Sequence, residues 1–171
     1  VLTKLTGGGD LRSVGSGNIG ATNVLRTGKK GVAALTLILD LLKGTLAVLA
    51  VGWLVPGGDW SQYAALAAAL GAVMGHCFSI FLKFSGGKGV ATYAGVAFGL
   101  SPVLGGIYAV LWIGILAVSR ISSLGGIVAA CAMPMVALII EQGEWAVVLL
   151  IISGVVVLKH SANIERLRAG T

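Results

Sequence analysis

Long apolar runs dominate this sequence and leave few folds open to it. A helix of roughly 20 mostly apolar residues crosses the hydrocarbon core of a bilayer, and the chain has apolar runs at 31–55, 63–82, 90–100, 103–118, 124–140 and 145–158. Hydrophobic residues make up 57% of the chain and charged residues 11%, whereas a soluble domain is about half apolar and a quarter charged. We therefore predict an all-α, polytopic integral membrane helix bundle, folded as a single domain over residues 1–171 and surrounded by the lipid bilayer.

The lengths of these runs refine the prediction. Four or five of them are long enough to span, but the run at 90–100 is too short for a full crossing. We interpret it as a short or broken helix, which is tolerated where protein surrounds it. The sequence starts at Val1, and a helix is expected to end near Leu5, so we expect the chain to be N-terminally truncated.

Small residues spaced one turn apart predict close contacts between helices. The pairs Gly71/Gly75 and Gly95/Gly99 both follow the G-x-x-x-G pattern. Such pairs let two helix backbones approach each other in lipid. We expect both pairs to lie at helix–helix contacts.

The distribution of basic residues orients the bundle. If the runs cross alternately, every Lys and Arg except Lys43 falls on one side, and the other side carries only acidic residues, Asp59, Glu141 and Glu144. Basic residues in short loops mark the cytoplasmic face. The basic side is therefore predicted to face the cytoplasm.

The stretch "GSGNIGATN" at 15–23 matches the G-x-G-x-x-G pattern of dinucleotide-binding proteins. That pattern requires a preceding strand and a following βαβ unit. Here the glycines follow a polar loop and precede a membrane helix, with Asp40 well inside that helix. We therefore reject a nucleotide site at this loop.

The two glycine-rich loops are nevertheless suited to bind anions. Glycines allow backbone N–H groups to converge on an anion, and a following helix N-terminus favours negative charge. Both loops lie on the predicted cytoplasmic face, and Arg26 and Lys88 supply one cation to each. As an alternative, they are interface turns whose basic residues only fix the topology. The candidate phosphate-binding residues are Gly15, Ser16, Gly17, Asn18, Thr22, Asn23, Gly86, Gly87, Lys88 and Gly89.

Other polar residues are supporting candidates. Asp40 and Lys43 stand three residues apart on one membrane helix, so they can form an ion pair, and ionisable residues in a membrane commonly mark function. A structural pair and a role with substrate are both open. We interpret His76 as a histidine whose hydrogen bonds are satisfied at the interface. If the last helix continues past residue 158, His160 and Asn163 share a face.

The sequence contains no metal-ligand spacing, so we predict no metal site. No Ser-His-Asp or Cys-His arrangement suggests a covalent mechanism. Any chemistry must then depend on positioning and electrostatics.

With these residues in view, the chain resembles the bacterial acyl-phosphate:glycerol-3-phosphate acyltransferase (PlsY) family. The matching stretches occur in the family's order and cover nearly the whole chain. They are "DLRSVGSGNIGATNVLR" with the following "LDLLKG", then "GHCFSIFLKFSGGKGVAT", "SRISSL" and "HSANIERL".

The resemblance implies a function and a location. It implies transfer of a fatty acyl group from a long-chain acyl phosphate to the sn-1 hydroxyl of glycerol 3-phosphate. The products are lysophosphatidic acid and inorganic phosphate, in the first step of phospholipid biosynthesis. It implies seven transmembrane helices, with the first largely missing here, in the bacterial cytoplasmic (inner) membrane and with the active site facing the cytoplasm. An upstream enzyme that forms acyl phosphate becomes a possible partner, and no nucleic acid is expected.

The resemblance also implies roles for particular residues. Ser16, Arg26, His160 and Asn163 match the family's catalytic positions. The phosphate loop matches 86–89, and the short Arg-x-x-Ser segment matches Arg120 and Ser123. One departure is the end of the chain: family members commonly have a Glu beyond "RLRAG", and Glu165 is not assigned its role.

Two other functions remain open at this stage. A small anion transporter would fit the short helix, Pro102, Pro134 and the Asp40–Lys43 pair, but no inverted repeat is visible. An acyl-CoA- or acyl-carrier-protein-dependent transferase would use the same kinds of residues.

Overall fold

The computed structural model describes residues 10–55, 57, 60–140 and 142–170, and within them the chain is helical, with no strand. The expected helix end near Leu5 lies outside the described residues. The fold is all-α, as predicted. The elements, with η denoting short 3-10 helices, are η1 Leu11–Ser13, α2 Ala21–Leu25, α3 Lys30–Leu54, α4 Trp60–Cys77, η2 Ile80–Leu82, α5 Val90–Leu100, α6 Pro102–Ser119, α7 Ser122–Ile139, α8 Gly143–Lys159 and α9 Ser161–Arg168.

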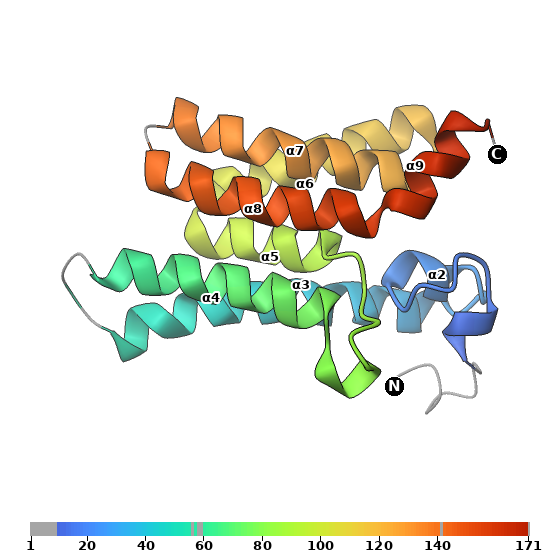
Figure 1. The fold of residues 1–171 in the computed structure, drawn as a ribbon, viewed down its shortest axis with the longest axis horizontal. Helices are drawn as coiled ribbons and strands as arrows, with labels where there is room; N and C mark the ends of the chain where they lie inside the picture. Colours follow the sequence, from blue (N-terminus) through green and yellow to red (C-terminus); the bar gives the residue numbers. More distant parts are fainter. Residues whose placement is uncertain (1–9, 56, 58–59, 141, 171) are drawn as a thin grey trace.

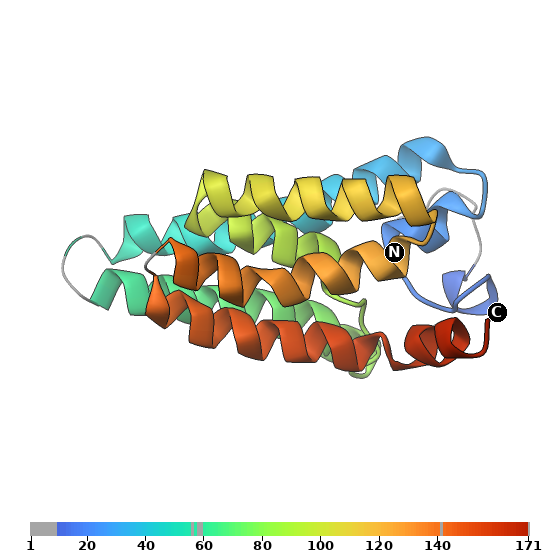
Figure 2. The ribbon, with the colours of Figure 1, turned by 90° about the horizontal axis from the view of Figure 1, so that it is seen from above.

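Most of the long helices can cross a bilayer. Among the described residues, four stretches are long and apolar enough: Lys30–Leu54, Ser61–Leu82, Pro102–Ser119 and Ser122–Ile139. α8 and α9 make a fifth if they count as one span bent by 60°. The long helices run side by side along nearly one axis (Figures 1 and 2). This agrees with the predicted four or five spans and makes the protein a polytopic membrane protein.

The short helix α5 lies at the centre of the bundle. It packs against α3, α4, α6 and α7. The Tyr93 hydroxyl donates to the Leu149 carbonyl oxygen of α8 at 3.0 Å and lies 3.1 Å from the Ser153 hydroxyl. Because protein encloses α5, an 11-residue helix is sufficient here. Its buried residues are Thr92, Tyr93, Gly95, Val96 and Ala97.

One of the two predicted glycine pairs forms a close helix contact. A Cβ added at Gly95 would lie 2.8 Å from the Leu41 carbonyl carbon, and one at Gly99 would lie 2.8 Å from Val48 Cβ. Only glycine therefore allows α5 to approach α3 this closely. The prediction for Gly71 and Gly75 is wrong, because both are exposed and no atom of the neighbouring described segments lies within 4 Å of an added Cβ.

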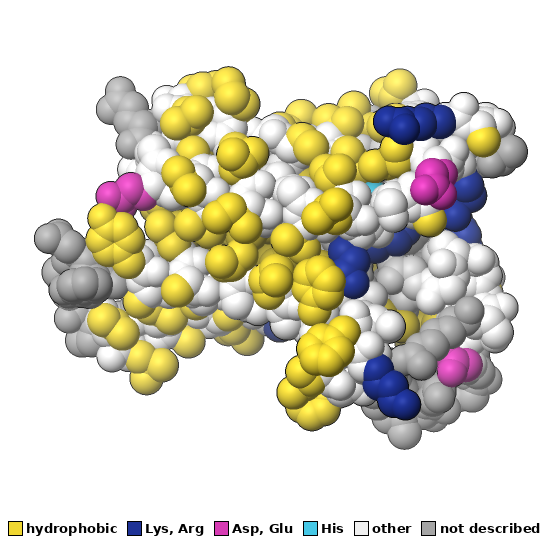
Figure 3. Space-filling view, in the orientation of Figure 1, with side chains coloured by type: hydrophobic (Ala, Val, Ile, Leu, Met, Phe, Trp, Pro, Cys, Tyr) yellow, Lys and Arg dark blue, Asp and Glu magenta, His cyan; other side chains and the backbone are white. Residues whose placement is uncertain are grey.

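Charge divides the molecule into two ends. In Figure 3 the visible Lys and Arg side chains lie in the half that holds α2 and α9, and hydrophobic side chains cover much of the flank. Glu144 lies toward the opposite end, where it accepts a hydrogen bond from the Tyr63 hydroxyl at 2.7 Å. Asp59 and Glu141 are outside the described residues. The gathering of basic side chains at one end follows the predicted partition, although acidic side chains are visible at both ends (Figure 3).

The contact of Gly95 with α3 gives a stability prediction. We expect Gly95→Ala to lower the free energy of unfolding by about 1–3 kcal/mol, since the new methyl group overpacks a backbone contact. Gly71→Ala is the matched control, because it adds the same group where space is open. The measurement is the fraction of folded protein that remains in detergent after heating. Equal melting of the two variants would contradict the packing argument.

Candidate active site

A pocket of about 660 Å³ opens at the basic end of the bundle. Three segments that are distant in sequence form it: the loop before α2, the turn between α6 and α7, and α9. Dark-blue basic side chains lie inside the hollow at this end in Figure 3. The lining residues are Gly15, Ser16, Arg26, Ile121, Ser123, Asn163, Arg166, Leu167 and Gly170.

Buried Asn23 holds the first glycine-rich loop in shape. Its Nδ2 donates to the carbonyl oxygens of Leu11, Val14 and Asn18 at 3.0, 2.9 and 2.7 Å, so its two N–H groups serve three acceptors. Its Oδ1 accepts the Ser16 backbone N–H at 3.3 Å. Each of these interactions is within the loop and η1. Asn23 was predicted from the sequence to bind phosphate, whereas in the structure the hydrogen bonds of its amide hold the loop together.

Gly15 lets Arg26 lie against this loop. Its φ of +54° is in the left-handed region, which favours glycine. A Cβ there would also lie 2.6 Å from Asn23 Oδ1 and 2.9 Å from Arg26 Nη1. The absence of a side chain therefore allows the guanidinium of Arg26, the residue that caps the C-terminal end of α2, to reach the pocket.

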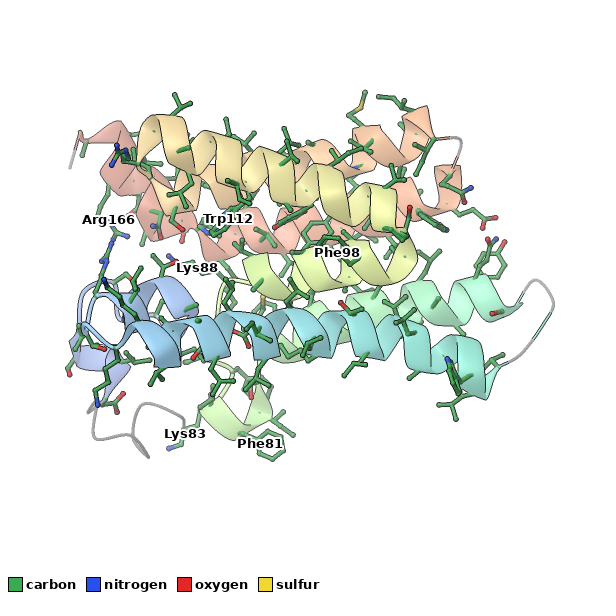
Figure 4. The ribbon with its side chains drawn as sticks, turned by 180° about the vertical axis from the view of Figure 1, so that it is seen from behind. Phe81, Lys83, Lys88, Phe98, Trp112 and Arg166 are labelled. Atoms are coloured by element: carbon green, nitrogen blue, oxygen red, sulfur yellow. The ribbon has the colours of Figure 1, made fainter. Side chains whose placement is uncertain are left out.

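Lys88 links the second glycine-rich loop to α9. Its Nζ donates to Asn163 Oδ1, which lines the pocket. Burial, and to a smaller extent the positive charges of Arg166 and Arg26, lower the pKa of Lys88 to about 8. In Figure 4, Arg166 extends from α9 toward the loop that precedes α2, at the same end as Lys88. Three cations held near one another favour the binding of an anion.

The α8–α9 junction overturns one sequence expectation. The last helix does not continue past residue 158 as one straight helix, because α8 ends at Lys159 and α9 leaves at 60°. His160 lies at the bend, almost fully buried, with Nδ1 2.7 Å from the Val156 carbonyl oxygen. Its own carbonyl accepts the Asn163 N–H at 2.8 Å. His160 and Asn163 are therefore neighbours across a corner, and only Asn163 lines the pocket.

The turn after α6 contacts the segment at 15–23 through Ser122, which was not predicted as a site residue. The predicted residue Arg120 is exposed and caps α6 in a left-handed conformation with φ +60°. The Ser122 hydroxyl lies 3.2 Å from the Thr22 hydroxyl, which joins this turn to α2. Ser123 lines the pocket, but Arg120 is not among its lining residues.

The structure thus separates the predicted residues into two groups. Gly15, Ser16, Arg26, Ser123 and Asn163 meet at the pocket, and Lys88 reaches them through Asn163. The others lie outside the pocket lining, and they are Gly17, Asn18, Thr22, Asn23, Asp40, Lys43, Gly86, Gly87, Gly89, Arg120 and His160.

Sequence reasoning missed Arg166. It follows Asn163 by three residues in α9, so the two side chains share one helical face. The three-residue spacing from Asn163 could have identified Arg166 as a pocket residue from the sequence.

Asp40 and Lys43 form the predicted ion pair, with Lys43 Nζ 2.5 Å from Asp40 Oδ1. Among the described residues, no three His, Cys, Asp or Glu side chains are grouped closely enough to hold a metal ion.

Comparison with known proteins identifies the family. The model of the family described as glycerol-3-phosphate acyltransferase matches residues 1–170. The chain belongs to this family. It is 48% identical over its full length to the glycerol-3-phosphate acyltransferase of Methylorubrum populi, covering 82% of that protein. It is 51% identical over 170 residues to that of Erythrobacter litoralis, covering 99% of this chain and 83% of the relative.

Two solved structures share the fold of this acyltransferase. Both are crystal structures of PlsY, an integral membrane glycerol 3-phosphate acyltransferase. The glycerol 3-phosphate form matches with a TM-score of 0.91 and 35% identity, over 99% of this chain and 83% of that one. The lysophosphatidic acid form matches with a TM-score of 0.83 and 33% identity, over 91% and 78%. The protein is therefore an integral membrane acyltransferase, and the transporter alternative is wrong.

Asn23 allows a test of the loop. We expect Asn23→Asp to lower acyltransferase activity by about tenfold or more, because a carboxylate would face three carbonyl oxygens without N–H groups to donate, and leaving buried acceptors unsatisfied costs about 1–3 kcal/mol. Asn23→Ala should have a smaller effect, since it adds no repulsion. The measurement is initial rate in membranes at matched protein amounts. Activity of Asn23→Asp equal to wild type would contradict this role.

The pKa of Lys88 leads to a pH prediction. A bound phosphate stabilises the protonated amine and raises its pKa, so binding has full strength below about pH 8 and weakens as pH rises through that value. We expect KM for one phosphate-bearing substrate to rise above about pH 8. Lys88→Arg is the matched control, because an arginine stays charged and should abolish this rise. If KM of Lys88→Arg rises with pH as it does in the wild type, a group other than Lys88 causes the rise.

Proposed function

We propose that this acyltransferase transfers a fatty acyl group from a long-chain acyl phosphate to the sn-1 hydroxyl of glycerol 3-phosphate. The products would be lysophosphatidic acid and inorganic phosphate. The arrangement of the cations carries this proposal, since both substrates are phosphates. The first glycine-rich loop and Arg26 line the pocket, and Lys88 of the second loop donates to Asn163 in the pocket wall. The two PlsY structures are a glycerol 3-phosphate form and a lysophosphatidic acid form of that relative, which supports the acceptor and the product.

The charges at the pocket suit phosphate-bearing substrates. Arg26, Lys88 and Arg166 come from three different parts of the chain and lie within electrostatic range of one another. Bringing such groups together is unfavourable unless an anion offsets their repulsion. A guanidinium binds phosphate oxygens in pairs, and an ammonium acts as a point charge.

The reaction then needs little from the protein beyond holding its substrates. The glycerol hydroxyl oxygen attacks the acyl carbonyl carbon and forms the ester bond. The bond from that carbon to the phosphate oxygen breaks, and phosphate leaves with the electron pair. Because acyl phosphate is already activated, no covalent intermediate on the enzyme and no cofactor are required. Ser16 and Asn163, which line the pocket, are assigned to orient the substrates by hydrogen bonds.

The hydroxyl proton is assigned to the leaving phosphate. His160 is the alternative acceptor, but it is buried and outside the pocket lining. Its Nδ1–H is directed at the Val156 carbonyl, and its backbone carbonyl holds Asn163. We infer that His160 acts through Asn163, by fixing the bend from which α9 presents that amide.

The placement of the site agrees with a lipid product. Ile121 and Leu167 give the pocket an apolar border, and the acyl chain is expected to enter there from the bilayer. The basic end is assigned to the cytoplasmic side of the bacterial inner membrane by its Lys and Arg residues. An enzyme that makes acyl phosphate is the expected upstream partner.

Substitution of the cations tests the proposal. We expect Arg26→Ala and Lys88→Ala each to lower kcat/KM by about 10²–10³, the usual cost of removing a preorganised electrostatic group. The measurement is phosphate release by purified protein supplied with palmitoyl phosphate and glycerol 3-phosphate. Palmitoyl-CoA in place of the acyl phosphate should give no transfer.

Two matched control variants also remove one positive charge each, but at residues outside the pocket. Lys83→Ala removes a lysine that points away from the bundle beside Phe81 (Figure 4), and Arg168→Ala removes an exposed arginine of α9. Both should retain near wild-type rates. Undiminished transfer by Arg26→Ala and Lys88→Ala, or preference for palmitoyl-CoA, would overturn the assignment.

A further inference from the structure

Three polar side chains meet where α3 passes the end of α4, outside the pocket. Lys43 Nζ lies 2.5 Å from Asp40 Oδ1 and 2.5 Å from His76 Nδ1. His76 Nδ1 is also 3.7 Å from Asp40 Oδ1. The His76 side chain is only 9% exposed and that of Asp40 19%, whereas the Lys43 side chain is 41% exposed, so protein encloses the histidine and the carboxylate but not the lysine.

The Lys43 ammonium determines which ring nitrogen of His76 carries the proton. The Lys43 ammonium has only hydrogens to offer, so Nδ1 of His76 must accept from it. A neutral ring that accepts at Nδ1 carries its proton on Nε2. Asp40 offsets the charge that Lys43 brings into a membrane-spanning helix. The three residues together hold the imidazole in one orientation.

The imidazole is packed directly against the second glycine-rich loop. The Gly87 N–H donates to the His76 carbonyl oxygen at 3.2 Å, and the Gly86 N–H donates to the Cys77 carbonyl oxygen at 3.2 Å. A Cβ added at Gly87 would lie 2.7 Å from Cε1 of the His76 ring. The ring therefore occupies the space in which any side chain at position 87 would lie.

The loop passes this constraint on to the pocket. Lys88 directly follows Gly87, and its ammonium donates to Asn163 in the pocket wall. α5 starts at Val90, two residues later, and is fixed in the bundle core. Lys88 thus sits between a fixed helix and a glycine held by the His76 ring, so a displacement of the ring is transmitted to the ammonium.

We propose that Asp40, Lys43 and His76 are positioning residues that hold the loop at 86–89 and so set the position of the Lys88 ammonium for a substrate phosphate. This inference rests on the proposed function, because it takes Lys88 to bind a substrate. A purely structural contact between α3 and α4 would affect stability alone. The proposed role requires in addition that substitution of these residues weakens substrate binding through Lys88.

The first experiment compares kinetic parameters. Lys43→Met and His76→Asn should raise KM for the substrate whose KM is also raised in Lys88→Ala, by about tenfold, a typical size for coupled neighbours. Lys43→Arg keeps the donor and the charge and should recover most of the loss. In a Lys88→Ala background, His76→Asn should cause little further change, because the group it positions is already absent.

A control variant separates positioning from stability. Glu144→Gln weakens the contact of Tyr63 with α8 at the other end of α4, so it can lower stability without touching the loop. Its KM values should match wild type. If His76→Asn behaves like Glu144→Gln, with lower thermal stability and unchanged KM, the three residues are only a structural tie and the inference is overturned.

The second experiment tests the contact of the ring with Gly87. Gly87→Ala should lower kcat/KM by about tenfold in the wild-type background but by less than about threefold when combined with His76→Ala, since the clash is with the ring. Gly86→Ala is the matched control, because its Cβ would meet the backbone carbonyls of residues 76 and 77. His76→Ala cannot relieve that clash. Equal losses for Gly87→Ala in both backgrounds would overturn the contact.

The two proposals fail in different ways. If the wild-type protein releases no phosphate from palmitoyl phosphate and glycerol 3-phosphate, the proposed function fails. If wild type is active and Lys88→Ala is impaired, but Lys43→Met and His76→Asn show wild-type KM values, only the positioning role fails.

Discussion

The enclosure of the short helix α5 is the constraint on which the rest of the structure depends. A helix of 11 residues is stable in this setting only if protein, not lipid, surrounds it. Gly95 brings its backbone against α3, and Tyr93 bonds it to α8. Because α5 begins directly after the loop at 86–89, fixing this helix also fixes where that loop ends. Packing in the bundle core therefore helps to fix the position of Lys88, the cation that reaches the pocket through Asn163.

The cationic end illustrates a balance between stability and function. Burial and two nearby arginines lower the pKa of Lys88, which means that the folded protein holds this charge at a cost. Arg26 follows α2 as its C-cap residue, and Arg166 lies in α9. A fold that keeps these cations near one another without a substrate has already met most of the electrostatic cost of binding an anion. Such preorganisation is what an electrostatic catalyst requires.

The sequence allowed the type and order of the long helices to be predicted, because hydrophobic length decides them in a bilayer. It also led to Ser16, Arg26 and Lys88, since cations and glycines next to a membrane helix are conspicuous. It did not predict the bend at His160, where no glycine or proline marks a break. Nor did it separate Gly71 from Gly95, because the pattern states spacing and not which face meets a neighbour. The role of Asn23 depends on three carbonyls whose positions only the folded loop defines.

The proposed acyl phosphate donor would explain why so many of the polar residues support the site without lining it. When the leaving group is already good, the protein contributes mainly by holding two anions in line, and an error of about 1 Å in that geometry can cost about a hundredfold in rate. Residues that shape the loops then matter as much as residues that touch substrate. Asn23 organises one loop, His160 the bend before Asn163, and His76 packs on the other loop. In each case a side chain outside the pocket lining fixes the backbone from which a pocket residue or Lys88 extends.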